Sequence, residues 1–165
     1  MVTTFFDSSV LVACYVVQAH SADARRAIMR VPVVPYTALH HLEVRNAFRL
    51  LVGWKRMTAT QSAAVLAHLE EDIASGRLAQ THVDLDAALL RAEELSARHS
   101  GRLLTRSLDV LHVAAALELS CPRFVTLDTR QSKLAAACGL KVINLRTKAM
   151  ASQPWTRRAG MGYAR

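Results

Sequence analysis

Four acidic residues of this chain lie in strongly apolar segments, where a charge has no obvious structural use. They are Asp7, Glu43, Asp109 and Asp128. An acid in apolar sequence is expected to be partly buried, and burial of an unpaired charge is costly. Separate buried acids can each pair with an arginine. Four acids that meet at one point would instead form a site for a hard divalent cation, because such ions prefer carboxylate oxygens.

Short β-branched or aromatic segments alternate along the chain with longer helical patterns. We expect strands over residues 2–6, 32–35, 77–83, 123–127 and 140–145, and helices over 8–18, 21–30, 38–55, 58–76, 85–99, 105–120 and 129–138. Gly101 is expected to stop the helix that begins near Leu85. This alternation predicts an α/β fold, with a parallel sheet covered by helices on both faces.

Two of the acids follow predicted strands directly. Asp7 and Asp128 each begin a turn from a strand into a helix. Ligands of open α/β sheets bind at the carboxyl ends of the strands, so both side chains are expected in one crevice. Asp109 lies in the first turn of its helix, where the helix dipole favours an anion. A simpler alternative is that Asp7 and Asp128 only cap their helices.

Glu43 is placed by the helical spacing around it. An apolar stripe is expected to face the sheet, with Glu43 on or beside it; its members are Leu39, Leu42, Glu43, Ala47 and Leu50. Pairing of Glu43 with Arg45 or Arg49 at the surface remains an open alternative. His112, one turn after Asp109, is expected to be a packed core histidine rather than a ligand. The leucines expected in the core of the 85–99 helix region are Leu89, Leu90 and Leu95.

Clustered carboxylates need a compensating cation. Two of them about 4 Å apart repel by about 4 kcal/mol at an intermediate effective dielectric constant. That is a large share of the roughly 5–15 kcal/mol by which a domain is stable. Oxygen ligands without a Cys/His set favour Mg²⁺ or Mn²⁺ over zinc.

The composition limits the class of protein. The 165 residues suit one domain over residues 1–146 and a basic tail over 147–165, and the 52% hydrophobic share is enough for a core. No apolar run is long enough to span a bilayer. Three cysteines without C-x-x-C spacing fit free thiols in the cytoplasm. The net charge of +8 favours a polyanionic partner such as RNA or DNA.

The ordered motifs resemble those of PIN-domain proteins, most closely the VapC-type toxins of type II toxin–antitoxin pairs. The segments that carry the resemblance are Asp7-Ser8-Ser9-Val10-Leu11, Glu43 in a helix after a short strand, Leu108-Asp109-Val110-Leu111-His112-Val113-Ala114-Ala115-Ala116, Phe124-Val125-Thr126-Leu127-Asp128-Thr129-Arg130 and Cys138-Gly139-Leu140-Lys141-Val142-Ile143. The resemblance implies a three-layer sandwich with a central, mostly parallel sheet flanked by helices. It also implies that the four acids are the catalytic and metal-binding positions, with Ser8 and Thr126 as supporting hydroxyl groups.

The expected function is therefore a Mg²⁺- or Mn²⁺-dependent endoribonuclease that acts as a toxin. Asp7, Asp109 and Asp128 are the expected ligands, Glu43 is a ligand or orients the attacking water, and Arg130 is expected to contact a substrate phosphate. The resemblance further implies a homodimer and a cognate antitoxin. The alternatives are a housekeeping nuclease of the same fold acting on RNA or DNA, and a nucleic-acid-binding module without catalysis. A phosphotransferase fits less well, because its usual Asp-x-Asp is replaced here by Asp7-Ser8-Ser9.

Overall fold

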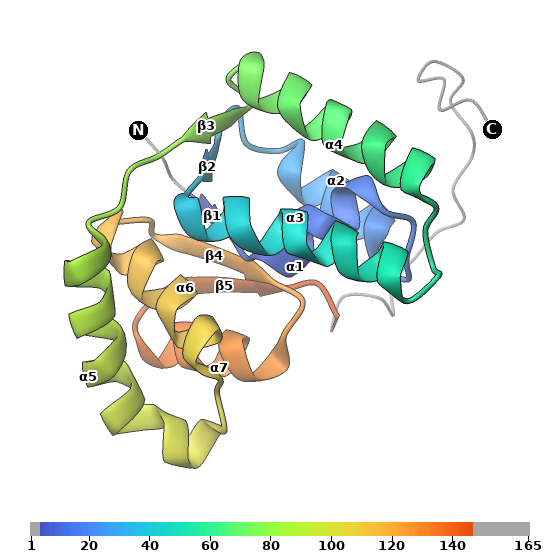
Figure 1. Ribbon diagram of the computed structural model, residues 1–165. Helices are drawn as coiled ribbons and strands as arrows, with labels where there is room; N and C mark the ends of the chain where they lie inside the picture. Colours follow the sequence, from blue (N-terminus) through green and yellow to red (C-terminus); the bar gives the residue numbers. More distant parts are fainter. Residues whose placement is uncertain (1–3, 147–165) are drawn as a thin grey trace.

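The computed structural model describes residues 4–146, which form five short strands and seven helices (Figure 1). The predicted tail at 147–165 and the first three residues lie outside this range. The elements are β1 (Thr4–Phe6), α1 (Ser8–Tyr15), α2 (Ser21–Ile28), β2 (Val34–Tyr36), α3 (Ala38–Gly53), α4 (Ala59–Ala74), β3 (Leu78–Gln80), α5 (Leu85–Leu103), α6 (Ser107–Glu118), β4 (Arg123–Thr126), α7 (Thr129–Ala137) and β5 (Lys141–Asn144).

All strand pairs in this part of the chain are parallel. β1, β4 and β5 pair in the order β1-β4-β5, and β2 pairs with β3. His40, in the first turn after β2, contacts the main-chain oxygen of Phe6 at the end of β1, with 2.8 Å from Nε2 to O. The carboxyl ends of β1 and β2 therefore lie side by side. The predicted parallel α/β architecture is confirmed.

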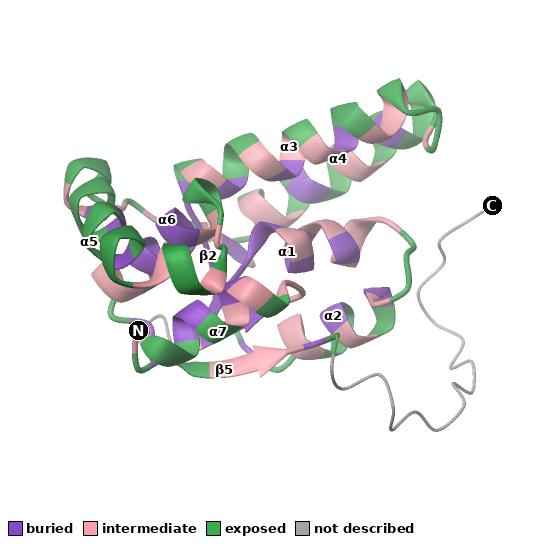
Figure 2. Cartoon of the chain, turned by 90° about the horizontal axis from the view of Figure 1, so that it is seen from below, coloured by how far each residue is buried: buried purple, intermediate pink, exposed green. Residues whose placement is uncertain are grey.

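Successive side chains of the strands enter two separate cores, because they point to opposite faces of a sheet. Phe5 and Phe124 pack with α5, α6 and α7, whereas Phe6 and Val125 pack with α1, α3 and α4. The same division of helices is visible in Figure 1, and Figure 2 shows the buried residues concentrated between the layers. The helices thus hold the strand ends rigidly from both faces.

Local capping fixes where the central helices begin. Thr37 accepts a hydrogen bond from the backbone N–H of His40 at 3.4 Å, and Thr58 accepts one from that of Gln61 at 3.1 Å. The side chains of His40 and Gln61 in turn accept from the N–H of the capping threonine, which is the reciprocal capping box. Both predicted helix starts are therefore confirmed.

Three expectations about helices are wrong. Gly101 does not end its helix; α5 continues to Leu103, and Leu104 adopts the left-handed conformation there with φ 55°. The fully buried residues of α3 are His40, Val44 and Phe48. Of the predicted stripe, Leu39 packs against a core and Glu43 and Ala47 are partly buried, but Leu42 and Leu50 are exposed. On α5, Leu95 is buried but Leu89 and Leu90 are exposed. In both helices the apolar residues alone predicted some side chains to be buried that are exposed. Which face of a helix is buried depends on the elements that pack against it in the tertiary structure.

Candidate active site

Asp7 and Asp128 lie at the carboxyl ends of the neighbouring strands β1 and β4. Asp7 caps α1 by accepting from the N–H of Ser9 at 3.2 Å. Asp128 caps α7 with one oxygen, which accepts from the N–H of Arg130 at 2.7 Å and of Gln131 at 3.0 Å. Both acids therefore do cap their helices, as the simpler alternative expects. The same parallel pairing also places both carboxylates at one edge of the sheet.

Glu43 reaches this edge from α3. Its Oε2 accepts from the hydroxyl of Ser8 at 2.7 Å and contacts Nε2 of His112. Arg45, which the surface alternative would pair with Glu43, instead bonds Glu70. The surface alternative is wrong, and Ser8 lies directly against one of the predicted acids.

His112 is buried, as expected for a core histidine, but it also contacts two acids. Its Nε2 lies 3.2 Å from the Ser8 hydroxyl and 3.7 Å from Asp7 Oδ1. Burial alone would lower the pKa of His112, yet the hydrogen bond to Glu43 and the charge of Asp7 raise it overall. For Glu43, burial would raise the pKa, but the bond to His112 lowers it overall. The contact therefore favours the charged form of both side chains.

Asp109 approaches from the start of α6. It is half-buried, and one of its oxygens accepts from the N–H of Arg106 at 3.2 Å. Its pKa is raised, first by burial and then by the negative charges of Asp128 and Asp7, against the opposing bond from Arg106. These three acids are thus close enough for their charges to act on one another.

Thr126 and Arg130 both contact Asp128, one from the core and one from the partly exposed side. The buried Thr126 hydroxyl accepts from the N–H of Asp128 at 2.9 Å. The guanidinium of Arg130 lies 3.8 Å from Asp128 Oδ2, and its side chain is 42% exposed. Thr126 therefore supports the turn from within, while Arg130 lies at the solvent side, where a phosphate can approach.

Two residues of the site are not predicted as such from the sequence. Gln131 is not among the candidates, and His112 is expected only to pack in the core. Gln131 is fully buried and contacts Asp7 and Thr126 through its side chain. Each residue stands three positions after a predicted acid, Asp109 or Asp128, close to the start of the same helix. Residues three apart share a helix face, so this spacing was the available signal.

The donor set suits a hard divalent ion, but it is not assembled as a ready-made site. Between residues 4 and 146, no group of three or more His, Cys, Asp or Glu side chains could hold a metal ion as they stand. The oxygens of Asp7 and Glu43 are turned toward hydroxyl, amide and imidazole groups of the protein. The pKa of Asp109 is raised by burial and by the nearby charges of Asp128 and Asp7, an environment that a bound cation would make more favourable for its carboxylate.

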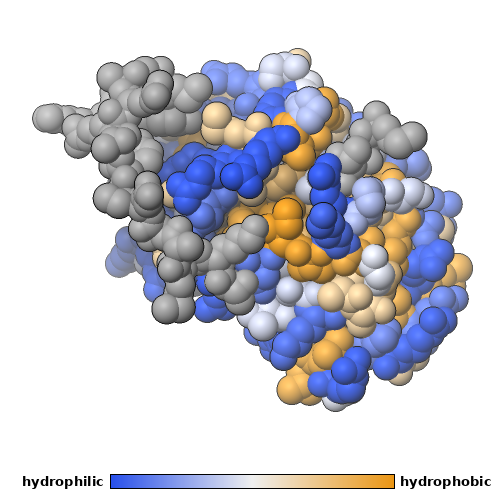
Figure 3. Space-filling model, turned by 180° about the vertical axis from the view of Figure 1, so that it is seen from behind, coloured by the Kyte–Doolittle hydropathy of each residue, from blue (hydrophilic) through white to orange (hydrophobic). Residues whose placement is uncertain are grey.

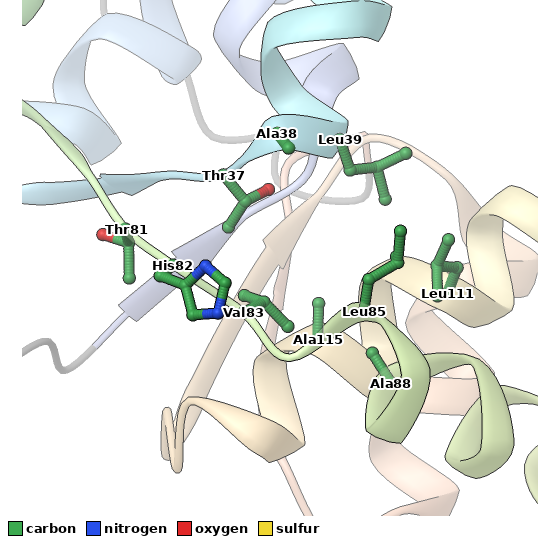
Figure 4. A pocket seen from close by; sticks show the side chains of 10 residues that line it. All are labelled: Thr37, Ala38, Leu39, Thr81, His82, Val83, Leu85, Ala88, Leu111 and Ala115. Carbon is green, nitrogen blue, oxygen red and sulfur yellow. The ribbon is translucent and has the colours of Figure 1, made fainter.

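A cavity of about 250 Å³ has none of the four acids in its lining (Figure 4). It opens between the start of α3, the segment after β3, and helices α5 and α6. Its lining is mostly apolar and consists of Thr37, Ala38, Leu39, Thr81, His82, Val83, Leu85, Ala88, Leu111 and Ala115. The lining contains no Asp or Glu that could bind a metal ion. The candidate active site is therefore the group of acids at the carboxyl ends of β1 and β4.

Comparisons with known proteins agree with this architecture. The family model of the PIN domain matches residues 4–137, and the chain therefore belongs to the PIN domain family. PIN domains are generally nucleases. Among solved structures, the crystal structure of FitAcB from Neisseria gonorrhoeae is similar, with a TM-score of 0.63 and 17% identity over 87% of this chain and 99% of that one. At this identity the likeness concerns the fold. No curated protein matches.

Within residues 4–146, no helix combines the length and hydrophobicity needed to cross a bilayer.

Proposed function

We propose that this chain is a metal-dependent endoribonuclease and the toxin of a type II toxin–antitoxin pair. The observation that carries the proposal is the convergence of three acids. Asp7 and Asp128 follow the paired parallel strands β1 and β4, and Gln131 bonds both Asp7 and the main chain of Asp109. The half-buried carboxylate of Asp109 has a raised pKa, first because of burial and also because of the charges of Asp128 and Asp7. A site that repels its own charges suits a bound cation. Membership of a nuclease family supports the same conclusion.

The proposed roles follow from the contacts. Asp7, Asp109 and Asp128 would hold Mg²⁺ or Mn²⁺, which when bound supplies Lewis-acid polarisation of the phosphodiester and acidifies water. Glu43 would orient the attacking water, since the hydroxyl of Ser8 and Nε2 of His112 fix its carboxylate. In-line attack would leave a 5′-phosphate and a 3′-hydroxyl.

The charge of the protein supports a polyanionic substrate. The whole chain carries a net charge of +8 around a local group of acids. Such a field draws nucleic acid toward the surface and leaves the acids to bind the ion. Arg130, partly exposed beside Asp128, would contact a phosphate next to the scissile one.

The proposed partners are a second copy of the chain and an antitoxin. Leu42 and Leu50 of α3 and Trp54 at its end are exposed by 62%, 42% and 61%. On the opposite side of the molecule from that seen in Figure 1, Figure 3 shows a further gathering of hydrophobic residues bordered by hydrophilic ones. Exposed apolar side chains of this kind are typical of protein interfaces.

One observation favours a second candidate, a PIN-fold module that binds nucleic acid without catalysis. The described residues hold no preassembled ligand cluster, and Asp7 and Asp128 already cap helices. The two candidates differ in whether Mn²⁺ binds and whether RNA is cut.

The first test measures cleavage and metal binding together. The parent, Asp7→Asn and Asp109→Asn are mixed with labelled RNA or single-stranded DNA and Mn²⁺, and Mn²⁺ binding is measured by calorimetry. We expect cleavage to fall at least about 100-fold in both variants, because removing a ligand costs more than removing a group that orients one. Asp86→Asn, on the exposed face of α5, is the matched control and should cut like the parent.

Thermal unfolding of Asp109→Asn gives a second readout. Without metal, this variant should be more stable than the parent at pH 7, by less than about 1 kcal/mol because the carboxyl is only half-buried. Excess Mn²⁺ should stabilise only the parent and reverse the order.

The outcomes of the cleavage test separate the candidates. Equal cleavage by the parent and both variants would overturn the assignment of Asp7 and Asp109 to the site, and absence of cleavage by the parent would end the nuclease proposal. Tight RNA binding without Mn²⁺ binding would establish the non-catalytic module. Cleavage of DNA in preference to RNA would favour a housekeeping role, whereas rescue of growth by a small protein encoded next to this one would favour the toxin.

A further inference from the structure

A single glutamine side chain connects the segments that carry three of the acids. Gln131 lies in the first turn of α7 and is fully buried. A buried amide is unfavourable unless its polar atoms are satisfied. Leu134 and Ala135 on the same helix show that apolar residues fill the neighbouring core. An amide at this position therefore needs a reason beyond packing.

The amide group bonds three segments at once. Its Nε2 donates to Asp7 Oδ1 at 3.2 Å and to the main-chain oxygen of Asp109 at 3.4 Å. Its Oε1 accepts from the hydroxyl of Thr126 at 2.6 Å. A carboxylate and a carbonyl can only accept, so Nε2 must face them and the orientation of the amide is fixed.

The backbone of the same residue adds a bond to the β4–α7 turn. The N–H of Gln131 donates to Asp128 Oδ1 at 3.0 Å. The hydroxyl of Thr126 that bonds the amide also accepts from the N–H of Asp128 at 2.9 Å. Gln131 is thus linked to the β1–α1 turn, to α6 and to the β4–α7 turn.

Asp7 is the acid whose orientation depends most on this amide. One of its oxygens is held by the hydroxyl and N–H of Ser9, and the other by Gln131. The oxygen that Gln131 holds also lies 3.7 Å from Nε2 of His112. Without the amide, this oxygen would lose the Gln131 donor, and the carboxylate could turn about its side-chain bonds away from Asp109.

We infer that Gln131 is a positioning residue of the acidic site, which holds the Asp7 carboxylate in the orientation that allows it to share an ion with Asp109 and Asp128. The inference rests on the proposed function, in which these acids bind metal. Gln131 does not touch the ion or the substrate. It acts by fixing the acids, and groups of this kind commonly change metal affinity by 10- to 100-fold.

The test replaces the amide by an apolar side chain of similar size. In Gln131→Leu and Gln131→Met, we expect the dissociation constant for Mn²⁺, measured by calorimetry, to rise at least about tenfold. The kcat for RNA cleavage should fall by a similar factor while KM for RNA stays unchanged, because the substrate contacts are intact. A purely packing role would change neither Mn²⁺ affinity nor the division between kcat and KM.

Two further variants complete the design. Thr126→Val keeps Gln131 but removes the hydroxyl that fixes Oε1, and should weaken Mn²⁺ binding by a smaller factor; it also serves if the Gln131 variants do not fold. Gln61→Leu is the matched control: it removes a glutamine that caps α4 through its side chain, far from the acids in the chain, and should bind Mn²⁺ like the parent.

The outcomes separate this inference from the proposed function. If the parent binds Mn²⁺, Asp7→Asn does not, and folded Gln131→Leu binds as tightly as the parent, the role of Gln131 is overturned and the metal site stands. If Thr126→Val is the only folded variant, parent-like affinity overturns it equally. If the parent binds no Mn²⁺, the proposed function fails and the inference fails with it.

Discussion

Glu43 and His112 meet at the site although 69 positions separate them in the sequence. Their contact shifts the pKa values of the two groups in opposite directions. The pKa of His112 rises above its ordinary value of 6.5, and that of Glu43 falls below 4.5, although burial acts against both shifts. His40, fully buried on α3, behaves differently: burial lowers its pKa to about 3, so it stays neutral.

The ion pair makes the stability of the protein depend on pH. A raised histidine pKa gives stability that is complete below 6.5 and is lost as pH rises through the folded-state pKa. A lowered glutamate pKa gives stability that is present above 4.5 and is lost as pH falls. The contribution of the pair is therefore greatest between these two values. We expect the part of the unfolding free energy that depends on Glu43 to decline from pH 6 to pH 9.

Glu43→Gln tests this dependence. At pH 6 it should lower the free energy of unfolding by about 2 kcal/mol, below the usual range for breaking a fully buried pair because the Glu43 side chain is 24% exposed. The difference from the parent should shrink by pH 9. Urea unfolding at both pH values measures it. Glu94→Gln breaks the exposed pair with Arg98 and should change stability by less than about 0.5 kcal/mol at either pH; an equal loss in both variants would contradict the assignment.

At the scale of the elements, two glycines in similar sequence contexts have opposite roles. Gly101 lies inside α5, whereas Gly76 follows α4 with φ +75°. A Cβ added at either position would meet no atom within 4 Å. Any effect of adding one therefore comes from the backbone conformation alone.

Replacement of each glycine by alanine should shift stability in opposite directions. Gly101→Ala should stabilise the protein by about 0.5–1 kcal/mol, because alanine favours the helix interior. Gly76→Ala should destabilise it by about 1 kcal/mol, because the left-handed conformation is costly for a residue with a Cβ. Urea unfolding of the two variants measures both effects. A loss of stability in Gly101→Ala would show that α5 ends where the sequence alone predicts.

At the scale of the whole molecule, the strands separate two cores and bring distant acids to one edge. Phe5 and Phe6, adjacent in β1, belong to different cores. Around this framework the chain carries a net charge of +8. Long-range attraction by that charge is expected to dominate the affinity for RNA, because each neutralised phosphate releases counterions.

RNA binding should therefore depend strongly on salt. For the inactive Asp7→Asn variant, we expect affinity for single-stranded RNA to fall about tenfold or more between 50 and 200 mM salt, as it does when several phosphates are neutralised. Fluorescence anisotropy of a labelled oligonucleotide measures this slope. Affinity that is constant over this range would contradict binding driven by the net positive charge of the chain.

Most of the fold follows from local sequence, and so do the positions of the acids along it. The strand before Asp7, the capping threonines Thr37 and Thr58 and the alternation of strands and helices are readable because capping and hydrophobic periodicity act over a few residues. Leu42 and Leu90 show the limit of that reading, since an apolar residue is buried only where another element covers it.

By itself, the sequence determined that acids would end two parallel strands and begin the nearby helices. Only the tertiary structure decided which groups each acid contacts: Glu43 bonds His112 instead of an arginine of its own helix, and Gln131 reaches Asp7 across 124 positions. The physical reason is range. Helix caps and strand ends are set by neighbours in the chain, whereas a buried polar group must find its partner wherever the packed layers bring one within hydrogen-bonding distance.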